Sequence, residues 1–243
     1  MIQRKADLLK QIKNESIRLD WEVAFGGKSY GNKHLYRVNK IAKYLQKYEG
    51  GDLFLVLASA WCHDVTLAFG IDDDPQKIAG YTKEFLTNFK ELREDEITSI
   101  VKIAMEHERG GSGISLEAQI VHDADVIDKS GMLGVVRHIW KTTNMIKERI
   151  LEGENDLGEL ERDLIEREKK VFTESAKKIV LTLNAERYLF FASKSQALEM
   201  LYEISKLADK GITSDDISLS LTKNLDYPCV IALNNQLSCG YLH

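Results

Sequence analysis

Apolar residues recur along most of the chain at spacings of three and four positions, which places them on one face of an α-helix. Prolines occur only at positions 75 and 228, and the sequence is rich in Leu, Ile, Ala, Lys and Glu. This pattern predicts an all-α protein. Helices are expected at about residues 3–23, 34–48, 53–64, 76–88, 94–106 and 115–131, and the helical pattern continues beyond them.

Two later segments depart from this pattern. Residues 152–170 are densely charged and lack apolar periodicity, so they are expected to form a solvated face or a mobile arm. Near the end of the chain, a short helical signal precedes the run YPCVIAL, which reads as a strand. We expect a helical domain over residues 1–205, followed by a C-terminal extension over residues 206–243 whose structure the pattern does not define.

The stretch LFLVLASAWCHD, residues 53–64, predicts the central helix of the protein. Its first nine residues are apolar or small, which predicts a helix buried on all sides. It ends in Cys62, His63 and Asp64, and buried polar groups without partners cost several kcal/mol. A carboxylate near a helix C-terminus is further disfavoured by the macrodipole. A bound cation would relieve both penalties.

Composition narrows the classes of function. The 243 residues are 44% hydrophobic and 29% charged, as in a soluble globular protein with a sizeable core. A net charge of -5 provides no basic face for a nucleic-acid duplex. No stretch is long and apolar enough to span a membrane, and the polar N-terminal helix is unlike a signal peptide, so a cytoplasmic location is expected. A homo-oligomer is compatible with this composition.

The cysteines do not suggest a site of their own. Cys62, Cys229 and Cys239 form no CxxC pair, and an odd, scattered set argues against a disulfide framework or a thiolate zinc site. Cys62 is expected to be a small core residue.

Histidines and aspartates instead predict a metal site. His34 opens the second helix, His63 and Asp64 end the central one, and Asp125 lies in the segment DADVID. Two imidazoles with two carboxylates favour Mn, Mg, Ni or Fe over a structural zinc site, with Zn as an alternative. Three signatures occur in order, HLYRV, CHD and IVHDADVIDKSG, at residues 34–38, 62–64 and 120–131. Together they resemble the HD superfamily of metal-dependent phosphohydrolases.

The resemblance implies an all-α, HD-type helical bundle with a core at about residues 30–140. It also implies that His34, His63, Asp64 and Asp125 bind a divalent metal ion. Asp125 is chosen over Asp123 because the resemblance places the last ligand directly before the V-I-D part of the segment. The implied reaction is hydrolysis of a phosphate ester or anhydride in a nucleotide or related small phosphorylated metabolite.

Neighbouring residues suggest the rest of the chemistry. Arg37 lies one helical turn after His34 and could hold a phosphate oxygen, or serve as a structural partner of Asp125 or Asp128. His107 and His122 are candidates for the proton donor to the leaving oxygen, or for helix caps. Asp64 would orient or deprotonate a metal-bound water.

The helical spacing adds two features. His122, Asp125 and Asp128 share one helical face. The sequence RGGSG at residues 109–113 could offer backbone amides to an anion, or form an ordinary loop.

Two other functions remain open. A di-iron oxygenase of the same scaffold uses two further histidines between the His-Asp pair and the last Asp, and His107 and His122 lie in that interval. Alternatively, the chain is a non-catalytic module that binds a metal or a nucleotide. Metal content and phosphate release distinguish these functions.

Overall fold

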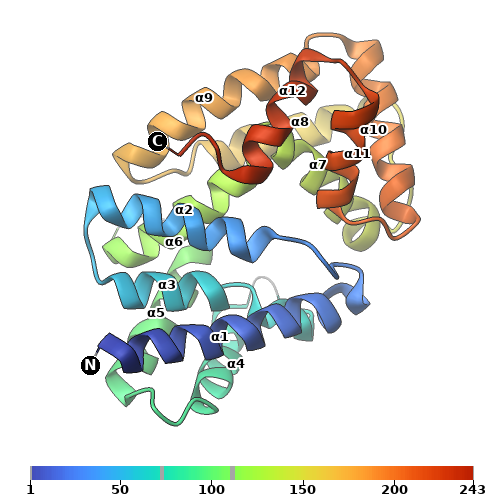
Figure 1. Cartoon of the computed structure of the whole chain (residues 1–243). Helices are drawn as coiled ribbons and strands as arrows, with labels where there is room; N and C mark the ends of the chain where they lie inside the picture. The colour runs from blue at the N-terminus through green and yellow to red at the C-terminus, as the bar shows by residue number, and fades with distance from the viewer. Residues whose placement is uncertain (1, 72–73, 110–112, 243) are drawn as a thin grey trace. The chain divides into compact units, whose positions relative to one another are not determined.

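The computed structural model describes residues 2–71, 74–109 and 113–242, and every regular element over these residues is a helix (Figure 1). The all-α prediction is therefore confirmed. No helix in the described part of the chain is long and apolar enough to cross a membrane.

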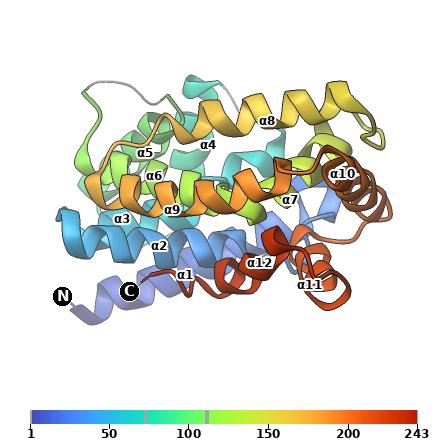
Figure 2. The same ribbon diagram turned by 90° about the horizontal axis from the view of Figure 1, so that it is seen from above.

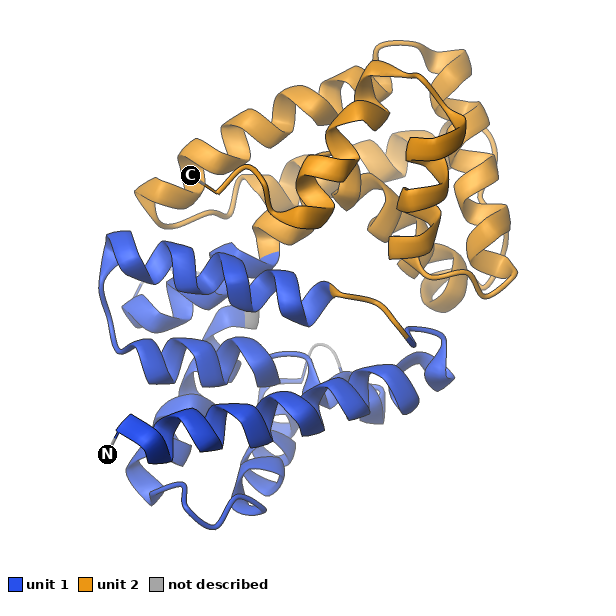
Figure 3. Ribbon diagram, viewed as in Figure 1, with its two compact units in different colours: residues 1–30, 34–125 blue, residues 31–33, 126–243 orange. Residues whose placement is uncertain are grey.

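The chain divides into two compact units (Figure 3). Unit 1 comprises residues 1–30 and 34–125, and unit 2 comprises residues 31–33 and 126–243. Unit 1 contains α1 (Ile2–Glu22), η1 (Ala24–Gly27), α2 (His34–Glu49), α3 (Leu53–Cys62), η2 (Val65–Phe69), α4 (Pro75–Thr87), α5 (Glu94–Arg109) and most of α6 (Leu116–Asp128). Unit 2 contains the end of α6, then α7 (Gly131–Lys141), the π-helix η3 (Thr142–Ile146), α8 (Glu154–Glu168), α9 (Glu174–Phe191), α10 (Lys194–Asp209), α11 (Ser214–Asn224) and α12 (Pro228–Ser238).

Helix α3 is the central helix of unit 1. It packs against α1, α2 and α5, and Figure 1 shows it between α1 and α2. The Asp52 carboxylate accepts hydrogen bonds from the backbone N–H groups of Phe54 and Leu55, at 2.8 and 3.0 Å, so it caps the helix N-terminus as its residue type predicts. Burial is less complete than expected, because Leu53 is 41% exposed, but the last five residues of the helix are buried.

Helix α7 is the central helix of unit 2. It packs against each of the helices α8 to α12, and Figure 2 shows it beside α9 and α10. Gln236 of α12 binds the backbone on both sides of the start of α7. Its Nε2 donates to the Ser130 carbonyl at 3.1 Å, and its Oε1 accepts from the Leu133 N–H at 2.8 Å. Gly131 in this turn has φ +63°, and a Cβ there would lie 2.3 Å from Gln236 Nε2. The positive φ favours glycine at this position, and a side chain would also displace the Gln236 amide.

Two expectations for the C-terminal half are wrong. The charged segment at 152–170 is not a mobile arm that lacks apolar periodicity, because most of it forms α8 with Leu157, Leu160 and Leu164 buried, while most of its charged residues form a solvated face. These leucines share one helical face, whose signal the surrounding charges dilute. The strand-like run YPCVIAL instead begins α12, in which Pro228 occupies the first turn, where its missing N–H costs nothing.

The predicted division at residue 205 stays a prediction. Residues 206–243 contribute the end of α10 and both α11 and α12 to unit 2.

Asp156 of α8 is the most strongly hydrogen-bonded acid of the predicted arm. Its buried carboxylate accepts from Arg149 Nη2 at 2.7 Å, from Lys147 Nζ at 3.0 Å and from the Glu152 N–H at 3.0 Å. Burial raises the pKa of Asp156, but the hydrogen bonds from Arg149 and Lys147 lower it by more, so the pKa falls to about 2. The ionised form therefore stabilises the folded chain.

We expect Asp156→Asn to lower the free energy of unfolding at neutral pH. Because the pKa of Asp156 is depressed in the folded state, its contribution is present above about pH 4 and is lost as the pH falls toward 2. Denaturant unfolding at pH 7, pH 4 and pH 2.5 should show the difference from the wild type narrowing at the lowest pH. Glu166→Gln, which removes an exposed carboxylate on α8, is the control and should change little at any pH. A difference that stays constant with pH would contradict the assignment.

Candidate metal centre

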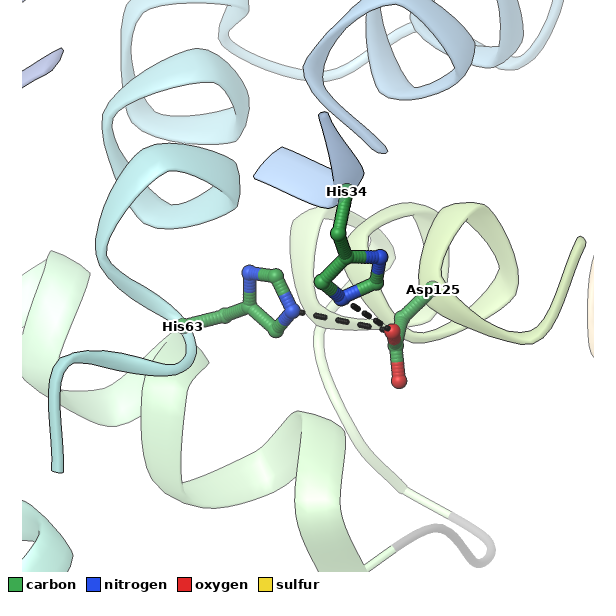
Figure 4. A group of neighbouring side chains, drawn as sticks. All are labelled: His34, His63 and Asp125. Carbon is green, nitrogen blue, oxygen red and sulfur yellow. Dashed lines mark ion pairs between the residues drawn. The ribbon is translucent and has the colours of Figure 1, made fainter. Parts of the chain in front are cut away.

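Two helices and the end of a third bring the predicted ligands together in unit 1. His34 is the first residue of α2, and Asp125 lies in the last turn of α6. His63 follows the last residue of α3, and Asp64 comes between it and η2. Figure 4 shows the rings of His34 and His63 and the carboxylate of Asp125 converging from separate elements.

The distances between these side chains are short. His34 Nε2 lies 3.3 Å from Asp64 Oδ2 and 3.3 Å from Asp125 Oδ1. His63 Nε2 lies 3.3 Å from the same Asp64 oxygen and 3.6 Å from the same Asp125 oxygen. The potential ligand atoms of His34, His63 and Asp125 all lie within 4.8 Å of one another, and the side chains are almost entirely buried.

This donor set fits a divalent metal ion. Ligand atoms about 2.1 Å from one ion are separated by about 3.0 to 3.4 Å when they are neighbours in its coordination shell. The distances of 3.3 to 3.6 Å between the imidazole nitrogens and the carboxylate oxygens are close to that range. Imidazole and carboxylate together suit the intermediate and hard divalent ions. The cluster could therefore hold one such ion.

The environment of His63 prepares its Nε2 for this role. Its Nδ1–H donates to the Ala60 carbonyl at 3.0 Å, which orients the ring and leaves Nε2 toward the carboxylates. Burial lowers the pKa of His63, but the nearby charge and hydrogen bonds of Asp64 and Asp125 raise it more, to well above its usual value. The two carboxylates therefore favour a positive charge at this position.

His107 and His122 lie beside the cluster rather than within it. The ring of His107 packs edge to face on His63, with 5.4 Å between centroids, and its Nδ1–H donates to the Ala104 carbonyl at 2.7 Å. The Nδ1–H of His122 donates to the His107 carbonyl at 2.6 Å. His122 therefore supports the backbone at His107, and His107 contacts the ring of His63. The spacing of histidines along the sequence did not predict these contacts, because they involve backbone carbonyl groups.

The other residues that the sequence pointed to near this site are Arg37, Asp123 and Asp128. Arg37 is buried on α2, one turn after His34. Asp123 is fully buried but does not belong to the group of potential ligands. Asp128, expected on the same face as Asp125, forms an ion pair with Arg137 of α7 at 3.6 Å.

Two further expectations concern the flanks of the site. Cys62 is a fully buried free thiol, as expected of a core residue, and burial raises its pKa to about 12. The suggested anion-binding run at residues 109–113 includes residues 110–112, which lie outside the described residues.

Comparison with known protein families identifies the part of the chain that contains these residues. Residues 32–130 match the HD domain family model, a range that includes His34, the His63–Asp64 pair and Asp125. No curated protein sequence matches the chain.

Several solved structures share the fold. A Lactobacillus plantarum protein is 26% identical, with a TM-score of 0.60 over 76% of this chain and 93% of its own. Bacillus subtilis YpgQ in complex with ADP is 19% identical, with a TM-score of 0.58 over 79% of this chain and 97% of its own. An HD-superfamily hydrolase from Bacillus thuringiensis is 22% identical, with a TM-score of 0.54 over 74% of this chain and 90% of its own. The chain thus contains an HD domain, over residues 32–130.

Proposed function

We propose that this protein is a metal-dependent hydrolase that cleaves a phosphate ester or anhydride in a nucleotide or related small phosphorylated metabolite. The observation that carries the proposal is the buried convergence of His34, His63 and Asp125, with Asp64 at 3.3 Å from both imidazoles. Two neighbours in fold support it, one described as an HD-superfamily hydrolase and one in complex with ADP.

In this proposal, His34, His63, Asp64 and Asp125 hold the ion, which is Mn, Mg, Ni or Fe, with Zn as the alternative. Such an ion lowers the pKa of a bound water and polarises a phosphoryl oxygen. Asp64 also has a second role, because a carboxylate oxygen not engaged with the ion can orient the attacking water or accept its proton.

Arg37 and His107 complete the proposed site. Arg37 lies one helical turn from His34, where its guanidinium would bind a phosphate oxygen and offset negative charge that develops during the reaction. His107 is better placed than His122 to protonate the leaving oxygen, because its ring lies against His63. His122 holds the His107 carbonyl and acts by positioning it.

The di-iron oxygenase alternative is less well supported. Among the described residues, the group able to hold a metal contains His34, His63 and Asp125 but neither His107 nor His122. We therefore favour hydrolysis over oxygenation.

Phosphate release from a panel of nucleoside mono-, di- and triphosphates tests the proposed reaction. The protein is stripped of metal and reloaded with Mn, Mg, Ni, Fe or Zn, and both phosphate and pyrophosphate are measured. Metal-dependent release is expected for at least one member of the panel. Absence of release with every metal would contradict the proposal. Two bound irons with oxygen uptake would then indicate the oxygenase, and nucleotide binding without turnover would indicate the binding module.

Asp64→Ala tests the ligand assignment. We expect bound metal to be lost and activity to fall by more than about 100-fold, since even partners outside the coordination shell cost about 10 to 100-fold. The chain should remain folded, because Phe54 and Val56 of α3 stay buried and each contributes about 1.5 to 3 kcal/mol. Metal analysis, activity and circular dichroism are compared with Asp95→Ala, an exposed control on α5. Retained metal and turnover in Asp64→Ala would overturn the assignment.

Arg37→Ala tests the phosphate contact. Loss of a charge-assisted hydrogen bond should raise KM and lower kcat/KM by about 10 to 100-fold, equivalent to about 1.5 to 3 kcal/mol. Metal content should stay near that of the wild type. Arg37→Lys should recover only part of the loss, because an ammonium lacks the planar fork of the guanidinium. Unchanged kinetics in Arg37→Ala would show that Arg37 has a structural role instead.

A further inference from the structure

The segment immediately before His34 is held by residues far away in the sequence. Residues 31–33 group with unit 2, although His34 itself belongs to unit 1 (Figure 3). The backbone N–H of Lys33 donates to Asp215 Oδ2 at 3.2 Å, and Asn32 Nδ2 donates to Ser214 Oγ at 3.4 Å. Ser214 and Asp215 are the first two residues of α11.

Asp215 therefore caps α2 from outside the helix. Lys33 directly precedes the first residue of α2, so its N–H lies at the helix terminus where backbone donors lack partners within the helix. A carboxylate at this end is also favoured by the helix macrodipole. The contact fixes the backbone position from which the His34 side chain begins.

Arg137 of α7 joins the same segment to the end of α6. Its Nη1 donates to Asn32 Oδ1 at 3.3 Å, and its Nε lies 3.6 Å from Asp128 Oδ2 in an ion pair. Asp128 is the last residue of α6, three residues after Asp125. One guanidinium thus connects a residue two positions before His34 with a residue one turn after Asp125.

The network is buried. Asn32, Asp128, Ser214 and Asp215 are each at most 6% exposed. Polar groups removed from water are costly to leave without partners, so these contacts resist displacement. The network therefore restrains the segments from which His34 and Asp125 extend.

We propose that Asp215 and Arg137 are positioning residues of the metal centre, which act through the backbone at Lys33 and through Asn32 and Asp128. Metal ligands must lie within about 0.2 Å of their proper distances, so a small displacement of His34 weakens binding. This assigns a role to α11, in the C-terminal region that the sequence pattern left undefined. The inference rests on the proposed assignment of His34 and Asp125 as ligands.

The first test measures Mn²⁺ affinity by calorimetry in the full chain. Asp215→Ala removes the cap and should weaken binding by about tenfold, at the lower end of the effect of partners outside the coordination shell. Asp215→Asn keeps an acceptor oxygen and should recover most of the affinity. Asp216→Ala is the matched control, because Asp216 is the exposed neighbour on α11 and pairs with Thr213 instead. Equal affinity in Asp215→Ala and the wild type would overturn the proposal.

A second variant distinguishes a loss of metal positioning from a general loss of stability. Arg137→Met keeps an unbranched apolar stem but removes both polar contacts, and it should also weaken Mn²⁺ binding. The absorption spectrum of the Co²⁺-loaded protein should change in Asp215→Ala and Arg137→Met, because it reports ligand geometry. A lowered melting temperature with unchanged affinity and spectrum would show a merely structural network. Failure of the wild type to bind any divalent ion would instead overturn the proposed function on which the inference rests.

Discussion

The central constraint in this molecule is the burial of Asp64 and Asp125 against the same two imidazoles. Each carboxylate has an oxygen 3.3 to 3.6 Å from His34 and His63, and both side chains are mostly removed from water. Two such negative charges repel each other and lose their hydration, so the site requires positive charge. The two carboxylates raise the pKa of His63, which reflects the same preference for positive charge. A divalent ion held by these residues would supply that charge.

The architecture of unit 1 follows from this requirement. Helix α3 packs against α1, α2 and α5, and its buried end delivers His63 and Asp64 to one place. A rigid, capped helix defines where its last residue lies, and the Ala60 carbonyl then sets the orientation of the His63 ring. His122 donates a hydrogen bond to the His107 carbonyl, and the ring of His107 packs against the ring of His63. The centre thus depends on backbone groups as much as on its own side chains.

Unit 2 contributes through the segments that enter and leave the site. Gln236 secures the turn between α6 and α7, while Asp215 and Arg137 engage the segment before α2. Packing around α7 brings α11 and α12 together with these contacts. If His34 and Asp125 are metal ligands as proposed, these unit 2 contacts restrain residues that directly precede His34 and closely follow Asp125 in the chain.

The sequence by itself determined the helical class, most helix positions in the first half and the four residues that gather at the candidate centre. Helical periodicity and the Asp52 cap are local signals, so they can be recognised without knowledge of the fold. The three ordered signatures indicated which distant residues lie close together. Only the tertiary structure decided that α8 buries a leucine face, that YPCVIAL is helical and that His122 supports His107. Likewise, the partners of Asp128 and Lys33 lie on α7 and α11. These outcomes depend on which surfaces and backbone groups meet after folding. The spacing of residues within a single segment does not specify those contacts.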